Sequence, residues 1–326
     1  MRRTALLIAL VLAAGACSPA ESGDTTTGQA SSTTVVDTTT TSLETTTTVS
    51  DGFPVAIAAA NGEVMVEERP DRIVSLSATA TEILFAIGAG DQVVAVDETS
   101  DYPEEVPTTD LSGYEPNIEA IAGYEPDLVV VSDDLGDVIA GLVAIDITVI
   151  QQPVAQTLAD TYAQIEQLGA ATGHIAEAAE VVGDMQIGID EILASIEAPP
   201  GSSFYHELDN SFFSVTSETF IGLIYSLAGL VNIADEAEGA GTGYPQLSAE
   251  HIIESDPDLI FLADTKCCGE SPETVAVRPG WDQLSAVSND SVIALDDDIA
   301  SRWGPRVVDF LAVIVDSVNA LETSGS

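Results

Sequence analysis

The sequence has very few positively charged residues. Only 8 Lys and Arg stand against 54 Asp and Glu in 326 residues, which gives a formal net charge of -46 at pH 7. Because phosphate backbones and anionic lipid surfaces are bound by clustered cations, we expect neither nucleic acid nor electrostatic adsorption to a membrane. Apolar residues still make up 45% of the chain. The composition therefore predicts a folded protein with an acidic surface, not a disordered acidic chain.

Histidine is also scarce, and the sequence lacks the common motifs of enzyme and metal sites. The three histidines, His174, His206 and His251, lie far apart in sequence. No zinc-ligand spacing, nucleophile elbow or Gly-rich phosphate loop is present. We expect no catalytic site and no resident metal or cofactor. An enzyme that uses the histidines and carboxylates, or a direct receptor for a metal ion, remains an alternative.

The first 16 residues have the pattern of a secretory signal peptide. A basic start at Met1 to Arg3 precedes an apolar run from Ala5 to Ala14, which is too short to span a bilayer. Gly15-Ala16 then precedes Cys17, and this stretch resembles a bacterial lipobox, although Ala14 stands where Leu is usual. The pattern predicts a chain anchored to the outer face of the cell membrane by lipidated Cys17. A plain secretory peptide is the alternative.

Residues 17–52 are rich in Thr, Ser and Gly and contain few large apolar side chains. Such a segment cannot bury enough apolar surface to fold. As a flexible linker it would span on the order of 30 Å. We expect it to tether the folded part to the lipid anchor.

The first predicted lobe, residues 53–153, begins with a β-hairpin and continues with alternating strands and helices. Asn61-Gly62 lies between two short strand-like runs and is a strong local signal for a hairpin turn. The later strands are continuous apolar runs separated by helices, which predicts a parallel sheet covered on both faces. We expect strands at 73–77, 93–96, 128–131 and 147–150, and helices at 79–87 and 118–123.

Residues 154–198 carry apolar residues at helical spacing, interrupted only at Thr172-Gly173. Two helices are therefore predicted, and the second runs from about His174 to Glu197. At 1.5 Å per residue it would span on the order of 35 Å. Pro199-Pro200-Gly201 ends it.

Residues 199–322 repeat the pattern of the first lobe. In both halves a Glu stands seven positions before a Pro-Asp-Leu that opens an apolar strand, at Glu119 and at Glu250. The strand and helix expected from Ile73 to Gly90 have a counterpart from Phe213 to Gly229. The sequence predicts an α/β fold of two Rossmann-like lobes joined by a long rigid α-helix. A ligand cleft is expected between the lobes, at the carboxyl ends of the strands.

Several motifs in order resemble the cobalamin and ferric-siderophore family of periplasmic solute-binding proteins that serve ABC transporters. They are the segment 72–91, Asp101-Tyr102-Pro103, Pro116 to Glu119, Leu247 to Glu250, Trp281 and Gly304-Pro305-Arg306. The resemblance implies a monomer that binds a metal chelate, cobalamin or a ferric siderophore, and delivers it to a membrane permease. Haem is an alternative ligand, and a surface lipoprotein without a transport role is an alternative of another class.

The same resemblance implies that Glu119 and Glu250, one in each lobe, dock onto the transmembrane subunits of the permease. Two equivalent sites would let the permease contact both lobes at once. The alternative is local. Each Glu follows a capping residue, Asn117 or Ser248, and could simply complement the helix dipole.

For the ligand pocket the resemblance points to Tyr114, Ser132, Phe213, Asp298 and Arg302, to which we add the neighbouring Trp303. Arg302 could hold an anionic or amide group of a ligand with its planar guanidinium. Alternatively it pairs with Asp298 at i, i+4, and Trp303 is buried packing. Thr99 and Ser132 stand where relatives place aromatic residues against a corrin ring, which argues against cobalamin itself.

Cys267 and Cys268 are adjacent, in a loop expected after the strand that ends near Ala263. With Cys17 acylated, they have only each other as partners in an oxidising compartment. A vicinal disulfide and two free thiols are both compatible with the sequence. The spacing of the two cysteines does not suit a metal site.

Overall fold

The computed structural model describes residues 52–197, 201–237 and 239–324. The predicted signal peptide, Cys17, almost all of the predicted linker and the Pro199-Pro200 pair lie outside these ranges. None of the helices in the described ranges combines the length and apolar character needed to cross a bilayer.

The first lobe begins with the predicted hairpin, formed by β1 (Val55–Ala59) and β2 (Gly62–Val66), which pair antiparallel. A parallel sheet of order β4-β3-β5-β6 follows. The inner strands β3 and β5 are buried along their whole length, as their continuous apolar sequences predicted. The strands are β3 (Ile73–Leu76), β4 (Val93–Val96), β5 (Leu128–Val131) and β6 (Thr148–Gln151).

Short, capped helices connect these strands. Helix α1 (Ala78–Ala86) begins after Ser77, whose hydroxyl accepts a hydrogen bond from the Ala80 amide. Helix α2 (Ile118–Ala122) begins after Asn117 in the same way. The Ser and Asn side chains satisfy amides that a helix start leaves without partners. The remaining connections of this lobe are η1 (Gly90–Gln92), η2 (Leu135–Asp137) and α3 (Val138–Val143).

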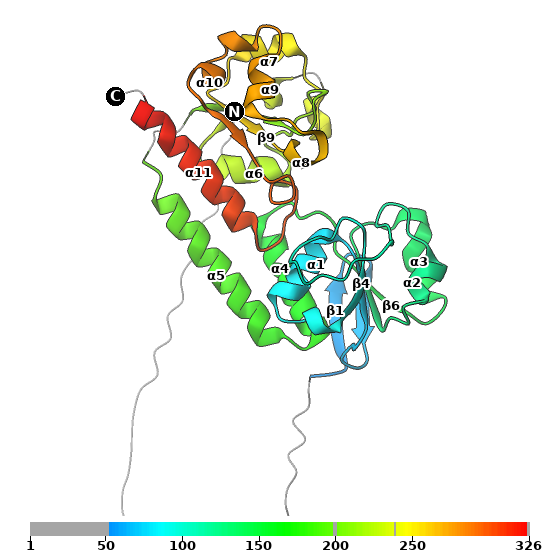
Figure 1. The fold of residues 1–326 in the computed structure, drawn as a ribbon. Helices are drawn as coiled ribbons and strands as arrows, with labels where there is room; N and C mark the ends of the chain where they lie inside the picture. Colours follow the sequence, from blue (N-terminus) through cyan, green and yellow to red (C-terminus); the bar gives the residue numbers. More distant parts are fainter. Residues whose placement is uncertain (1–51, 198–200, 238, 325–326) are drawn as a thin grey trace, which may run out of the picture. The chain divides into compact units, whose positions relative to one another are not determined.

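Two longer helices lead from the first lobe to the second. Helix α4 (Leu158–Thr172) starts with a capping box between Thr157 and Asp160 and stops at Gly173, which has a positive φ of 79°. Helix α5 (Ile175–Ala194) follows directly. It packs along the C-terminal helix α11 (Val307–Ser324), and the two lie side by side in Figure 1. The predicted long connecting helix is therefore present.

The second lobe has a parallel sheet of order β10-β9-β7-β8. In each lobe the sheet order by chain position is second, first, third, fourth, so the two lobes share one topology. The strands are β7 (Ser203–Glu207), β8 (Val231–Asn232), β9 (Leu259–Leu262) and β10 (Val292–Ala294). The helices are α6 (Phe220–Leu227), η3 (Ile233–Glu236), η4 (Ala240–Thr242), α7 (Ala249–Ser255), α8 (Thr265–Cys268), α9 (Pro272–Ala276), η5 (Trp281–Gln283) and α10 (Ser285–Ser288).

One expectation about the second lobe was wrong. The strand that corresponds to β3 is β7, which lies before Phe213, whereas Phe213 makes only an isolated bridge with Gln246. The sequence concealed β7 because it ends in His206 and Glu207, two polar residues that are nevertheless completely buried.

A single apolar cluster extends through both lobes and the connecting helices. It contains Ile73 and Leu128 of the first sheet, Phe204 and Phe261 of the second, and Ile314 of α11. Because this core is continuous, the lobes are packed together and not merely tethered. The described part of the chain thus confirms an α/β fold of two lobes joined by a long helix.

Candidate ligand-binding site

A cavity of about 470 Å³ lies at the carboxyl ends of the first lobe's strands and is closed on one side by a segment of the second lobe. Parallel α/β sheets place ligands at this edge because the loops after the strands converge there. The described structure thus contains the predicted cleft between the lobes. Its lining residues are Leu76, Ser77, Ala78, Thr79, Asp97, Thr99, Gly113, Tyr114, Ser132, Asp133, Leu135, Val154, Asp298, Ser301, Arg302 and Trp303.

The structure brings together five of the six residues predicted for the pocket, namely Tyr114, Ser132, Asp298, Arg302 and Trp303. Phe213 is not among them. It lies in the loop that pairs with Gln246 in the second lobe and is 38% exposed. The family resemblance placed Phe213 near the pocket, whereas the structure places it in this loop, away from the residues that line the cavity.

Tyr114 lies at the rim of the cavity and is 72% exposed. The preceding Gly113 lets this loop approach the strands closely. A Cβ atom there would lie 2.8 Å from Oδ2 of Asp97 and 3.0 Å from the carbonyl oxygen of Leu76. The rim position of Tyr114 therefore depends on glycine at 113.

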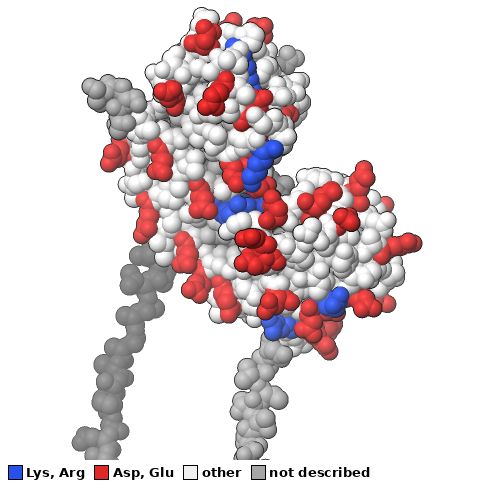
Figure 2. Space-filling model, in the orientation of Figure 1, with Lys and Arg blue, Asp and Glu red and all other residues white. Residues whose placement is uncertain are grey.

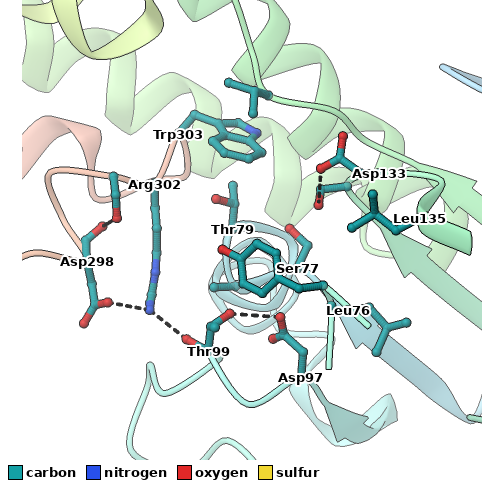
Figure 3. Close-up of a pocket in the computed structure, with 16 residues that line it drawn as sticks. Leu76, Ser77, Thr79, Asp97, Thr99, Asp133, Leu135, Asp298, Arg302 and Trp303 are labelled. Atoms are coloured by element: carbon teal, nitrogen blue, oxygen red, sulfur yellow. Dashed lines mark hydrogen bonds and ion pairs between the residues drawn. The ribbon is translucent and has the colours of Figure 1, made fainter. Parts of the chain in front are cut away.

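Trp303 forms one wall of the cavity (Figure 3). Its Nε1 donates a hydrogen bond of 2.9 Å to Oε1 of Gln164 on α4, and Gln164 donates 2.7 Å to the carbonyl oxygen of Pro153. The indole is also packed against the apolar core. Trp303 is thus partly buried packing on one side and cavity wall on the other.

The guanidinium of Arg302 is bound by protein acceptors. Its Nη1 donates to Glu82 at 2.7 Å, while its Nη2 contacts the carbonyl oxygen of Thr99 at 2.8 Å, Asp101 at 2.9 Å and Asp298 at 2.7 Å. The predicted i, i+4 pair with Asp298 is present, together with partners more than 200 positions away. Burial opposes the charge of this side chain, yet its carboxylate partners raise the pKa of Arg302.

Asp97 is the deepest carboxyl group of the cavity. It is 4% exposed and accepts hydrogen bonds from the hydroxyl groups of Thr99 and Ser100. Burial raises the pKa of Asp97, and the two hydroxyl donors oppose that effect. At the mouth of the cavity, Asp133 is exposed and accepts 3.2 Å from the hydroxyl of Ser132.

Residues 73–299 match the model of a family described as periplasmic binding protein. The chain belongs to this family. The match, together with the similar proteins below, confirms the family resemblance that the sequence motifs indicated.

Three known proteins are similar to this chain along most of its length. The uncharacterized ABC transporter substrate-binding lipoprotein YvrC of Bacillus subtilis (strain 168) is 29% identical over 325 residues, which is 96% of this chain and 95% of that relative. The structure of vitamin B12-binding protein BtuF of Vibrio cholerae is 27% identical with a TM-score of 0.64, and covers 79% of this chain and 99% of that one. The structure of a possible iron-binding (periplasmic solute-binding) protein from Staphylococcus epidermidis is 25% identical with a TM-score of 0.66, and covers 77% and 99%.

In this binding protein the two glutamates singled out for docking occupy equivalent places. Glu119 lies in the first turn of α2, and Glu250 lies in the first turn of α7. Each helix leads into the third strand of its sheet, and each Glu is exposed. The capping residues Asn117 and Ser248 accept hydrogen bonds from the helix amides as expected.

The two adjacent cysteines lie in the short helix α8, where the structure joins them by a disulfide. Asp297 holds the start of this helix, since its carboxylate accepts from the amides of Thr265, Lys266 and Cys267. The disulfide does not line the cavity. Within the described ranges, no group of three or more His, Cys, Asp or Glu is arranged to hold a metal ion.

Sequence reasoning missed the two acidic residues Asp97 and Asp133 and most of the hydroxyl groups of the cavity. A signal for them existed. Asp97 directly follows β4, Asp133 lies two positions after β5, and Ser77 directly follows β3. Residues that follow predicted parallel strands converge at one edge of the sheet, and this rule alone would have placed Asp97 and Asp133, whereas Ser77 was counted as the last residue of its strand.

Proposed function

We propose that this chain is the extracytoplasmic solute-binding lipoprotein of an ABC importer. It captures a metal-chelate nutrient, cobalamin or a ferric siderophore, and delivers it to the permease. The observation that carries the proposal is the cavity formed by both lobes, because a ligand held by Ser77 and Thr79 on one side and by Ser301 and Trp303 on the other stabilises one arrangement of the lobes.

The similar proteins support this assignment. The Bacillus relative is named as an ABC transporter substrate-binding lipoprotein. Two structural neighbours are named for vitamin B12 and for iron. The cavity has the mixture of an apolar wall and convergent polar groups that small-molecule sites use, with Leu76, Leu135 and Val154 beside the hydroxyl groups.

Binding can be tested on the chain from residue 18 onward by following its thermal unfolding with cyanocobalamin, ferrioxamine B, ferrichrome and haemin. A ligand of the native state stabilises it by about 2.7 kcal/mol at a hundred times its Kd. We expect a cobalamin or a ferric hydroxamate to raise the unfolding midpoint in proportion to the logarithm of its concentration. If none of the four probes changes the midpoint at millimolar concentration, the proposal is wrong. If haemin alone raises the midpoint, the ligand class is haem and not a cobalamin or a ferric siderophore.

We further propose that lipidated Cys17 anchors the protein and that Glu119 and Glu250 contact the permease. The anchor is tested by expressing the full chain and its Cys17→Ser variant. The parent is expected in the membrane fraction and in the detergent phase of a Triton X-114 separation, whereas the variant loses this partitioning. Equal partitioning of the two proteins would contradict the anchor.

A further inference from the structure

The charged groups that line the cavity are three carboxylates and one guanidinium. Asp97, Asp133 and Asp298 line the cavity together with Arg302, and Asp298 lies beside the guanidinium of Arg302 (Figure 3). A cation with a free donor pointing into the cavity would give the strongest recognition of an anion, because hydrogen bonds between charged groups are about twice as strong as neutral ones. Arg302 is the only cation among the lining residues, so the charge preference of the site depends on whether its donors are available.

The donors of Arg302 are already used by the protein. Both terminal nitrogens are engaged, with Glu82 on Nη1 and with Asp101, Asp298 and the Thr99 carbonyl on Nη2. The residue is only 9% exposed. An anionic ligand would have to displace one of these carboxylates from the guanidinium and then lie beside the displaced charge. Arg302 therefore acts as the neutralising partner of acidic residues and offers no anion site.

The neighbouring cations are committed in the same manner. Lys266 lies 2.9 Å from Asp296 and 2.5 Å from Asp298, and Arg306 is bound to Glu82. Around the cavity, four carboxylates thus share three cations. The four carboxylates belong to Glu82, Asp101, Asp296 and Asp298.

No other Lys or Arg in the described ranges offsets this excess of carboxylates over cations. Arg69 donates to the main-chain carbonyl of Thr172 at the end of α4, Arg72 donates to that of Tyr124, and Arg278 binds Glu207 and Glu270. None of the three lines the cavity. In Figure 2 the few basic residues on the visible face lie among more numerous acidic ones on both lobes. The charged side chains that line the cavity therefore sum to a negative formal charge, which favours a negative potential there.

We propose that the cavity selects uncharged or positively charged chelates and rejects anionic ones. This inference rests on the proposed function and narrows its ligand class. Corrinoids with intact amide side chains and ferric trishydroxamates satisfy the requirement, whereas ferric triscatecholates, with three negative charges, and haem, with two propionates, do not. The hydroxyl oxygen atoms of Ser77, Thr79, Thr99, Ser132 and Ser301 can accept hydrogen bonds from the amide N–H groups of the accepted class.

The test uses two sets of ligands in which charge changes on one chelate. Ferrioxamine B carries a positive amine, its N-acetyl derivative is neutral there, and its N-succinyl derivative is negative. Aquocobalamin at pH 6, cyanocobalamin and a cobalamin monocarboxylic acid form a parallel set. Ferric enterobactin is the strongly anionic probe. Affinities are measured by calorimetry at about 20 mM and about 500 mM NaCl, which changes the screening length severalfold.

We expect the affinity to fall on the order of tenfold for each negative charge added at low salt, and the difference to shrink at high salt. Asp133→Asn removes an exposed carboxylate of the cavity and keeps the shape of the side chain. It should reduce the difference in affinity between the differently charged ligands of each set. Asp71→Asn, an exposed carboxylate outside the cavity lining, is the matched control and should leave it unchanged.

The outcomes separate this inference from the function on which it rests. Equal or tighter binding of the anionic members, or binding of ferric enterobactin, overturns the charge selection while solute binding stands. Charge selection by the cavity is also contradicted if the difference in affinity between the uncharged and the anionic ligands is as large in Asp133→Asn as in Asp71→Asn. If no member of either set binds, the proposed function itself is wrong.

Discussion

Oε1 of Glu82 lies 2.7 Å from Nη1 of Arg302, and this buried ion pair joins the two lobes. Glu82 belongs to α1 of the first lobe, and Arg302 belongs to the segment that leads into α11. Arg306, at the start of α11, binds the same carboxylate and also stacks on Tyr102 at 4.0 Å from the ring centre. One carboxylate thus holds two cations of the other lobe, directly beside the cavity.

Replacing Glu82 by Ala should strongly destabilise the protein. The substitution leaves Arg302 and Arg306 without their shared partner in a site where Glu82 is 3% exposed. Removing one member of a buried ion pair costs about 3–5 kcal/mol. Urea unfolding followed by tryptophan fluorescence measures this loss. Lys266→Ala, which breaks the ion pairs of a half-exposed side chain with Asp296 and Asp298, is the control and should cost at most about 1 kcal/mol. A loss below about 1 kcal/mol in Glu82→Ala would contradict this account.

Charge reversal at Glu119 and Glu250 should abolish transport and spare ligand binding. Both side chains are exposed, and neither lines the cavity. Rim charges of this kind set the rate and specificity of docking to a partner. We expect Glu119→Arg and Glu250→Arg each to lower ligand-stimulated ATPase activity of the reconstituted transporter at least tenfold, with unchanged ligand Kd. Glu63→Arg, an exposed residue on the hairpin, is the control. Loss of ligand affinity in either variant would place these glutamates in the binding site instead.

Asp264 should make the stability of the second lobe depend on pH. It is completely buried, and as a carboxylate it has no hydrogen-bond partner. Burial and the nearby Glu207 and Glu270 raise its pKa to about 7. The native state holds this proton more tightly than the unfolded chain, so protonated Asp264 adds to the free energy of unfolding at low pH. This addition is lost as the pH rises from about 4 to about 7, by at most about 1.4 kcal/mol per pH unit.

Asp264→Asn tests this dependence, since the amide can donate to Glu207 without carrying a charge. Relative to the parent, the variant should gain stability between pH 5 and pH 7.5 and show no further gain at higher pH. Unfolding midpoints measured across this range decide the question, with the exposed Asp71→Asn as the matched control. A constant difference between variant and parent at every pH would show that Asp264 does not titrate in this range.

The features that the sequence predicted well are those with a local signal. Asn61-Gly62 marks the hairpin, Gly173 marks the break between α4 and α5, and the repeated Glu and Pro-Asp-Leu spacing marks the two lobes. These patterns arise from turn geometry and strand burial, which act over a few residues. The presence of two similar lobes followed because this spacing occurs once in each half.

The features that were missed depend on contacts between distant parts of the chain. Nothing near Arg302 indicates that Glu82, 220 positions earlier, will occupy its donors. Strand β7 was misplaced because buried His206 and Glu207 resemble exposed residues in sequence. Their burial is explained only in three dimensions, where Tyr225 contacts the ring of His206 and Arg278 binds Glu207 through two hydrogen bonds of 2.6 Å.

Salt should stabilise this protein more than it stabilises a domain of balanced charge. The chain has a formal net charge of -46, and repulsion between like charges favours expanded states. Raising NaCl from about 0.02 M to about 1 M shortens the screening length from about 20 Å to about 3 Å and removes most of this repulsion. We expect the thermal midpoint to rise over this range.

The rise should be smaller in a variant with Glu67→Lys and Glu68→Lys. These residues are exposed, so reversing their charge lowers the repulsion without disturbing packing. The alternative is that salt acts chiefly by weakening ion pairs such as Lys266 with Asp298. The midpoint would then fall with NaCl, and the double variant would show the same slope as the parent.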